Sequence, residues 1–168
     1  MFASVARLAS AAALAATLAA SPAAFAQSAG ATAPQLAGDG VVRVKSAYPL
    51  DETIARLKRD IAAKGIRFFQ EVDQHRLAAE AGIKVLPSTL LVFGNPPLGT
   101  QFLSATPQAG LDWPVRLLVQ QDQKGDVWAV YTDFIWIARR HGVRESERAP
   151  FETASGVIAS ITSAVRAQ

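Results

Sequence analysis

The sequence predicts an α/β protein of the α+β two-layer sandwich type, with helices packed on a mixed sheet of about five strands. Two observations lead to this prediction. Five short segments with strand-like patterns of apolar residues alternate along the chain with four or more segments of helical periodicity. The chain also has 168 residues, enough to bury a core without cross-links, and it contains no cysteine with which to form disulfides.

The five predicted strands differ in how their apolar residues are spaced. In residues 41–46, Val42 and Val44 alternate with charged side chains, the period of two that is typical of a strand with one buried face. Residues 89–93 (TLLVF) are apolar without alternation, which predicts a central strand covered on both faces. The other predicted strands are residues 66–73, 115–120 and 127–131.

Helical periodicity and end signals predict the helices between these strands. Ile54, Leu57 and Ile61 recur at spacings of three and four after Asp51, which we expect to cap this helix, and Gly65 ends it. Further helices are predicted at about residues 74–81, at 99–105, after Thr132-Asp133 and over 151–166.

The N-terminal 26 residues have the pattern of a secretory signal. Arg7 precedes an uncharged run over residues 8–20, and Ala24-Phe25-Ala26 fits the small-residue cleavage pattern. We therefore expect cleavage after Ala26 and a periplasmic product. Residues 27–40 (QSAGATAPQLAGDG) are small, polar or rich in Gly and Pro, which predicts a flexible leader before a single domain at 41–168.

The charge pattern argues against several classes of partner. Lys and Arg number 17 against 14 Asp and Glu, with no basic run interleaved with aromatics, so no nucleic acid is expected to bind. The sequence contains no basic amphipathic stretch, so membrane binding is not expected after signal cleavage. His75 and His141 lie in different predicted helices without a second ligand at metal-binding spacing, so neither a metal site nor another cofactor is predicted.

The segment 93–100 (FGNPPLGT) is the strongest candidate for a ligand site. Gly94 and Gly99 permit close approach of a ligand to the backbone, and two consecutive prolines stiffen the loop. If a helix begins at Gly99, the free N–H groups of Gly99, Thr100 and Gln101 form an anion site. The alternative is a tight strand-to-helix connection in which glycine and proline serve the geometry alone.

Asp112 is a lone acid in the segment 107–114 (PQAGLDWP), directly before a predicted strand. It could bond to the 94–100 loop, contact a cationic ligand, or act as a general base assisted by His75 or Asp73. An aspartate before Trp-Pro can equally satisfy backbone N–H groups in a turn, and the sequence favours that role. The candidate ligand-binding residues are Gly94, Asn95, Gly99, Thr100 and Asp112.

Three motifs in the same order resemble the bacterial family called domain of unknown function 302. They are residues 86–100 (LPSTLLVFGNPPLGT), 110–119 (GLDWPVRLLV) and 127–143 (VWAVYTDFIWIARRHGV). The resemblance covers about residues 41–145. It implies a compact α/β fold that is able to dimerise and no established activity, so it assigns no catalytic residue.

These observations lead first to a non-enzymatic module that binds or senses a small, anionic ligand at the loop 94–100. Two alternatives stay open. One is a hydrolase or isomerase that uses Asp112 as its base. The other is a protein-interaction module, a homodimer that works through a sheet edge or through the C-terminal helix.

Overall fold

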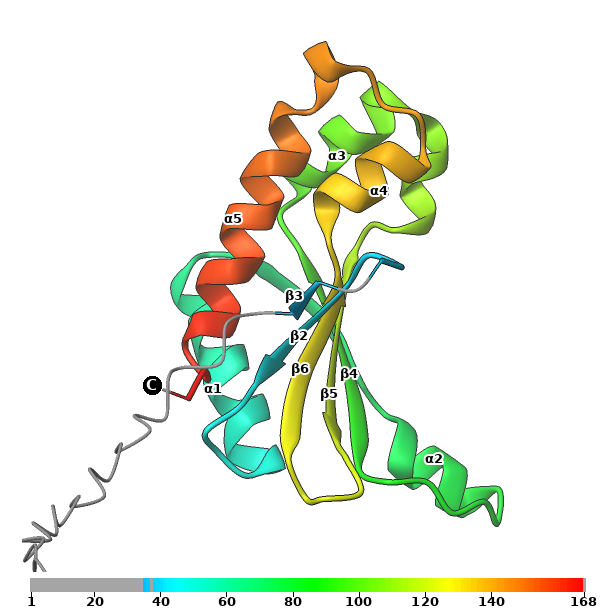
Figure 1. Ribbon diagram of the computed structural model, residues 1–168, viewed down its shortest axis with the longest axis vertical. Coiled ribbons are helices and arrows are strands. Elements are labelled where there is room, and N and C mark those ends of the chain that lie inside the picture. Colours follow the sequence, from blue (N-terminus) through cyan, green and yellow to red (C-terminus); the bar gives the residue numbers. More distant parts are fainter. Residues whose placement is uncertain (1–34, 37, 168) are drawn as a thin grey trace, which may run out of the picture.

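The computed structural model describes residues 35–36 and 38–167 (Figure 1). They form one six-stranded sheet of order β1-β2-β6-β5-β4-β3, in which every neighbouring pair is antiparallel. The α+β class and the five predicted strands are confirmed. The prediction of a mixed sheet is wrong, because no two neighbouring strands of the described sheet run parallel. The strands are β1 (Gln35–Leu36), β2 (Val41–Lys45), β3 (Arg67–Asp73), β4 (Ser88–Gly94), β5 (Val115–Gln121) and β6 (Val127–Thr132).

The predicted signal, its cleavage after Ala26 and residues 27–34 of the predicted leader lie outside the described residues. Gln35 and Leu36, which the sequence assigns to the same leader, pair as β1 with Arg43 and Val42 of β2. The sheet therefore begins within the segment that was expected to precede the domain.

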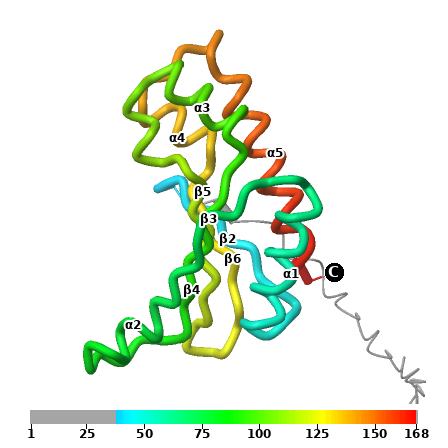
Figure 2. The backbone as a smooth tube through the Cα atoms, turned by 180° about the vertical axis from the view of Figure 1, so that it is seen from behind, coloured from blue at the N-terminus to red at the C-terminus, as the bar shows by residue number. Residues whose placement is uncertain are grey.

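The helices cover one face and one end of the sheet (Figures 1 and 2). Helices α1 and α5 lie along one face, α3 and α4 gather at one end, and α2 projects from the opposite end. Among the helices of the described residues, none is both long and apolar enough to cross a bilayer. The α-helices are α1 (Leu50–Ala63), α2 (Gln74–Glu80), α3 (Pro96–Ala105), α4 (Phe134–Arg140) and α5 (Ala149–Ser163), with short 3₁₀ helices at 107–111 and 145–147.

Burial alternates along β2, β4, β5 and β6 because helices cover only one face of the sheet. In β4, Leu91 and Phe93 are buried, whereas Leu90 and Val92 on the opposite face are half-buried. The prediction that this strand is covered on both faces is therefore wrong. The helices contribute to the same core a set of buried apolar side chains: Ile54, Leu57, Ile61, Phe151, Ile158 and Ile161.

The helix starts show which capping predictions hold. Asp133 caps α4, where its Oδ1 accepts a hydrogen bond from the Trp136 amide at 2.8 Å. The predicted cap of α1 is wrong: Pro49 occupies the N-cap position, and Asp51 lies in the first turn. A carboxylate in the first turn still faces the positive end of the helix dipole.

Candidate functional site

Helix α3 begins at Pro96 and not at Gly99, the start on which the predicted anion site depends. Its first two positions are prolines, which have no N–H, and the amides of Leu98 and Gly99 both donate to the Asn95 carbonyl, at 3.1 and 2.8 Å. Thr100 and the next residue lie in the helix body, where each amide bonds to the carbonyl four residues earlier. The predicted anion site on these amides is therefore wrong.

Gly94 and Gly99 serve the packing of Trp113. Both glycines are buried, and a β-carbon on Gly99 would lie 1.8 Å from Trp113 Nε1, while one on Gly94 would lie 3.1 Å from the same atom. Phe69 meets the indole edge-on, with ring centroids 6.4 Å apart. The two glycines let the end of β4 and the start of α3 close on the indole, as the connection-only alternative predicts.

Two adjoining cavities lie beside the start of α3. The inner crevice of about 30 Å³ has room for one or two water molecules, and Gly94, Asn95 and Gly99 form part of its otherwise apolar and aromatic lining. The outer groove, of about 440 Å³, lies between α3, α5 and the end of α1. Thr100 lines neither cavity. The residues that line both cavities are Ile66, Asn95, Leu98 and Val157.

The groove is open where it meets α5. A β-carbon on Gly156 would have no atom within 4 Å, so no side chain fills this part of the groove. Thr153 and Ser160 add hydroxyl groups to the apolar lining, and the charge of Lys64 is offset by its ion pair with Asp60. The groove therefore combines an apolar surface with neutral polar groups.

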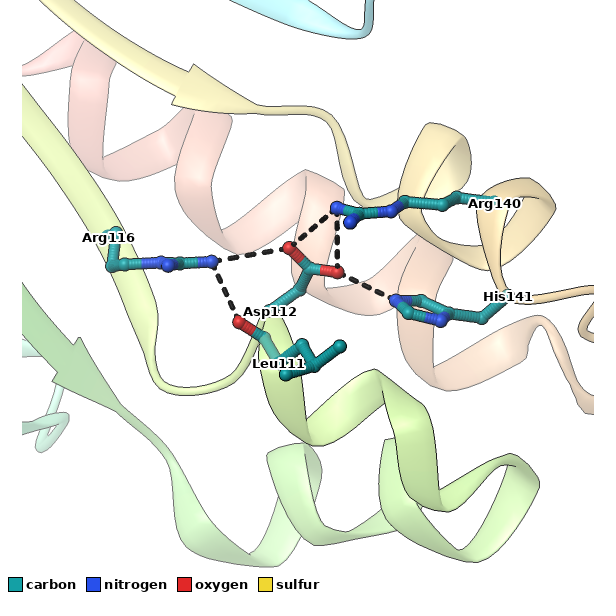
Figure 3. Close-up of polar contacts among 5 residues, drawn as sticks. All are labelled: Leu111, Asp112, Arg116, Arg140 and His141. Carbon is teal, nitrogen blue, oxygen red and sulfur yellow. Dashed lines mark hydrogen bonds and ion pairs between the residues drawn. The ribbon is translucent and has the colours of Figure 1, made fainter.

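Asp112 lies outside the crevice and the groove, and its side chain is only 8% exposed. Three side chains converge on its carboxylate (Figure 3). Arg116 Nη2 donates to Oδ1 at 3.2 Å and to the Leu111 carbonyl at 2.8 Å, and Arg140 Nη1 donates to Oδ1 and Oδ2 at 3.3 and 3.4 Å. His141 Nε2 lies 2.7 Å from Oδ2. We call Asp112, Arg116, Arg140 and His141 the Asp112 cluster.

This geometry corrects the predicted surroundings of Asp112. Its carboxylate bonds to side chains and not to backbone N–H groups, so the turn role that the sequence favours is wrong. Asp73 instead caps α2, and His75 Nδ1 bonds to the Val85 carbonyl. Asp73 pairs with Thr89 at the start of β4, and His75 follows it in α2. Asp112 instead comes just before Val115, which pairs with Phe93 near the other end of β4. Neither residue can assist Asp112.

His141 is the partner of Asp112 that sequence reasoning missed. It follows Asp112 by 29 residues and stands at the C-cap of α4, so its position suggested only a favourable charge at a helix end. The signal was present in the short loop between the strands predicted at 115–120 and 127–131. Pairing of β5 with β6 places the segment before β5 beside the helix that follows β6.

The charged side chains of the Asp112 cluster bond to one another around a single carboxylate. Its carboxylate accepts four hydrogen bonds, which occupy the positions that a general base needs for a substrate proton. No hydroxyl group of the described residues bonds to His141, and the same residues contain no group of three His, Cys, Asp or Glu placed to hold a metal. Tyr131 lines a cavity of about 20 Å³ beside Asp112, and burial raises the pKa of its phenol.

Part of this chain is similar in sequence to part of several known proteins. Proteins named fluoride-specific ion channel FluC 1, from Brucella suis biovar 1 (strain 1330) and Brucella abortus biovar 1 (strain 9-941), are each 38% identical to this chain over 104 residues, 62% of its length. The matched segment is 41% of the first protein and 38% of the second. The chain thus spans about two fifths of the length of these relatives.

The fold and the family agree with the resemblance seen in the sequence. An uncharacterised conserved DUF302 protein from Bacillus stearothermophilus has the same fold, with a TM-score of 0.69 at 17% identity over 76% of this chain and 98% of that one. The family described as Domain of unknown function DUF302 matches residues 42–166. The chain belongs to the DUF302 family.

Proposed function

We propose that this protein is a binding module for a small, largely apolar, neutral molecule, which lies in the groove between α3, α5 and the end of α1. The observation that carries the proposal is the groove itself, about 440 Å³ in volume, which adjoins an apolar crevice beside Trp113. A volume of this size lies in the range of sites that hold small molecules, about 300–1,000 Å³.

The lining of the groove determines the class of ligand. Apolar side chains of Ile66, Leu98 and Val157 favour an apolar chain, and Asn95 and Ser160 offer hydrogen bonds to a hydroxyl or carbonyl group at its end. The prolines that begin α3 leave no helix amides for an anion. A neutral amphipathic molecule therefore suits this site better than the anion that the sequence led us to expect there.

Gly156 provides the test, because its place in the groove is open. We would titrate the protein with 1-hexanol and follow backbone amide shifts by NMR, comparing the natural chain with Gly156→Leu and Gly156→Ala. A leucine side chain would occupy part of the groove and should weaken hexanol binding at least about tenfold, whereas alanine, which adds one methyl group, should leave it within about twofold. Both residues favour the helix similarly, so the pair separates occlusion from helix stability.

The proposal fails if hexanol shifts no amide near the groove, or if Gly156→Leu binds hexanol as well as Gly156→Ala does. Retained binding in the leucine variant would place the hexanol elsewhere on the surface.

A second candidate function follows from the relatives that are named as fluoride channels. We propose that the chain acts alongside fluoride transport and that it binds fluoride itself. Thermal unfolding in sodium fluoride and in sodium chloride of equal concentration tests this. A ligand at about 100 times its Kd stabilises a protein by about 2.7 kcal/mol, so saturating fluoride should raise the Tm by several degrees. Equal Tm values in the two salts would contradict it.

A further inference from the structure

We propose that the Asp112 cluster is a binding site for a small oxyanion, a molecule that bears a sulfate, phosphate or carboxylate group, held by Arg116 and Arg140. The site is separate from the proposed groove, since none of these residues lines the groove or the crevice. The oxyanion proposal can therefore succeed or fail independently of hexanol binding in the groove.

The first argument is the balance of charge. Arg116 and Arg140 both form ion pairs with Asp112, and neither pairs with another acidic side chain in the part of the chain that the structure describes. Two guanidinium groups, which stay protonated in proteins, thus face one carboxylate. One positive charge is left over even when His141 is neutral, and a bound anion would neutralise it.

The second argument is the surplus of hydrogen-bond donors. The Asp112 carboxylate already accepts four hydrogen bonds, about as many as its two oxygens can take. Each arginine carries five N–H donors but uses only one terminal nitrogen, Nη2 of Arg116 and Nη1 of Arg140. The two side chains are 53% and 48% exposed, so their other donors are accessible to a ligand.

The third argument is that the two arginines are held together before any ligand arrives. Arg116 comes from β5 and Arg140 from α4, and both donate to the same oxygen, Oδ1 of Asp112, from different sides (Figure 3). Asp112 and His141 are themselves 8% and 6% exposed, so this anchor is rigid. An oxyanion that accepts from the exposed donors of both side chains would meet two guanidinium groups that are already held in place, at a small entropic cost, and their planar forks match its geometry.

The test is a titration of the protein with sodium sulfate at constant ionic strength, with sodium chloride as the balancing salt. NMR signals of the arginine Nε–H groups report binding at each side chain. We expect saturable shifts for Arg116 and Arg140 with a Kd on the order of 1 mM. Arg140→Gln and Arg116→Gln should each weaken binding at least about tenfold, and Arg140→Lys, which keeps the charge but loses the fork, should weaken it less.

Arg139→Gln is the matched control. It removes the same charge from the neighbouring position of α4, and Arg139 forms no ion pair among the described residues. Sulfate affinity should stay within about twofold in this variant. Circular dichroism checks that each variant is folded. If a glutamine variant does not fold, Arg140→Lys still tests the role of Arg140.

Three results would overturn the proposal. Shifts that do not saturate by about 50 mM sulfate would show that no site exists. Unchanged affinity in both glutamine variants would place the sulfate elsewhere. An equal loss in Arg139→Gln and Arg140→Gln would reduce the effect to general attraction by positive charge.

Discussion

Gly99 lies so close to the indole of Trp113 that a β-carbon would stand 1.8 Å from Nε1. No side chain other than hydrogen fits there unless the indole or α3 moves. This contact joins the first turn of α3 to the segment that leads into β5, and it forms one wall of the crevice. The need for glycine at this position comes from packing between two segments, not from a special backbone angle.

We therefore expect Gly99→Ala to lower the free energy of unfolding by about 1–3 kcal/mol, the usual cost of overpacking. Gly156→Ala is the control, because its β-carbon meets no atom within 4 Å in the middle of α5. That substitution should raise the free energy of unfolding by about 0.5–1 kcal/mol. Urea denaturation measures both. A Gly99→Ala variant as stable as the natural chain would show that Trp113 moves aside at little cost.

The start of α3 shows why the sequence predicted the wrong ligand site. The prolines of the pattern FGNPPLGT fit two different structures, since proline stiffens a loop but also favours the first position of a helix. With Pro96 and Pro97 in a loop, the predicted helix starts at Gly99 and three amides are left free. With the prolines inside the first turn, the two residues that could have left amides unpaired carry no N–H.

Strand positions were predictable, while strand direction was not. Alternation in β2 and the apolar run in β4 depend on local burial, which the residues themselves encode. Pairing depends on contacts between distant segments, such as Val42 with Tyr131 across β2 and β6. Loop lengths in this chain fit both hairpins and crossovers, so the sequence could not distinguish a mixed sheet from the antiparallel sheet.

Asp112 and His141 should depend on one another for stability. Their side chains are nearly buried and bonded at 2.7 Å, so removing either leaves a polar partner without its bond. We expect Asp112→Ala and His141→Ala each to cost about 1–3 kcal/mol in the free energy of unfolding. The double variant should cost less than the sum, with a coupling of about 0.5–3 kcal/mol. Additive costs in a double-mutant cycle would contradict this prediction.

The loop between β5 and β6 predicts a dependence of stability on pH. Trp128 Nε1 donates to Asp122 Oδ2 at 2.9 Å, and this bond, with further bonds from the Lys124 and Asp126 amides, holds the pKa of the Asp122 carboxyl below its usual range. The folded protein thus binds this proton more weakly than the unfolded chain does. The stabilisation is present above the usual carboxyl pKa and is lost as the pH falls through the lowered one.

The measurement compares the natural chain with Asp122→Asn by urea denaturation at several pH values. Their difference in free energy of unfolding should be largest near neutral pH and should shrink as the pH falls below the usual carboxyl pKa of about 4. Trp128→Phe removes the indole bond to Asp122, which contributes most to the lowered pKa, and should remove part of the same pH dependence. A difference that stays constant over this range would show that Asp122 has the same pKa in both states.

The arm made of α2 and residues 81–87 should be the least stable described part of the fold. It contains no buried side chain, and four of its apolar side chains are exposed: Leu77, Ile83, Val85 and Leu86. A segment that buries so little apolar surface opens locally at a small free-energy cost. Hydrogen exchange at low protein concentration should therefore be much faster in α2 than in α1, whose Leu57 and Ile61 are fully buried.

Exchange at rising protein concentration tests the homodimer that the sequence left as an alternative. A second copy that covers the arm would slow exchange in α2 as the concentration rises, because the four exposed apolar side chains would then be buried. A second copy that pairs through a sheet edge or through α5 would slow exchange there and leave α2 unchanged. If α2 is as protected as α1 even in dilute protein, the arm must gain its stability from contacts other than those described here, and the prediction of a weakly held arm is wrong.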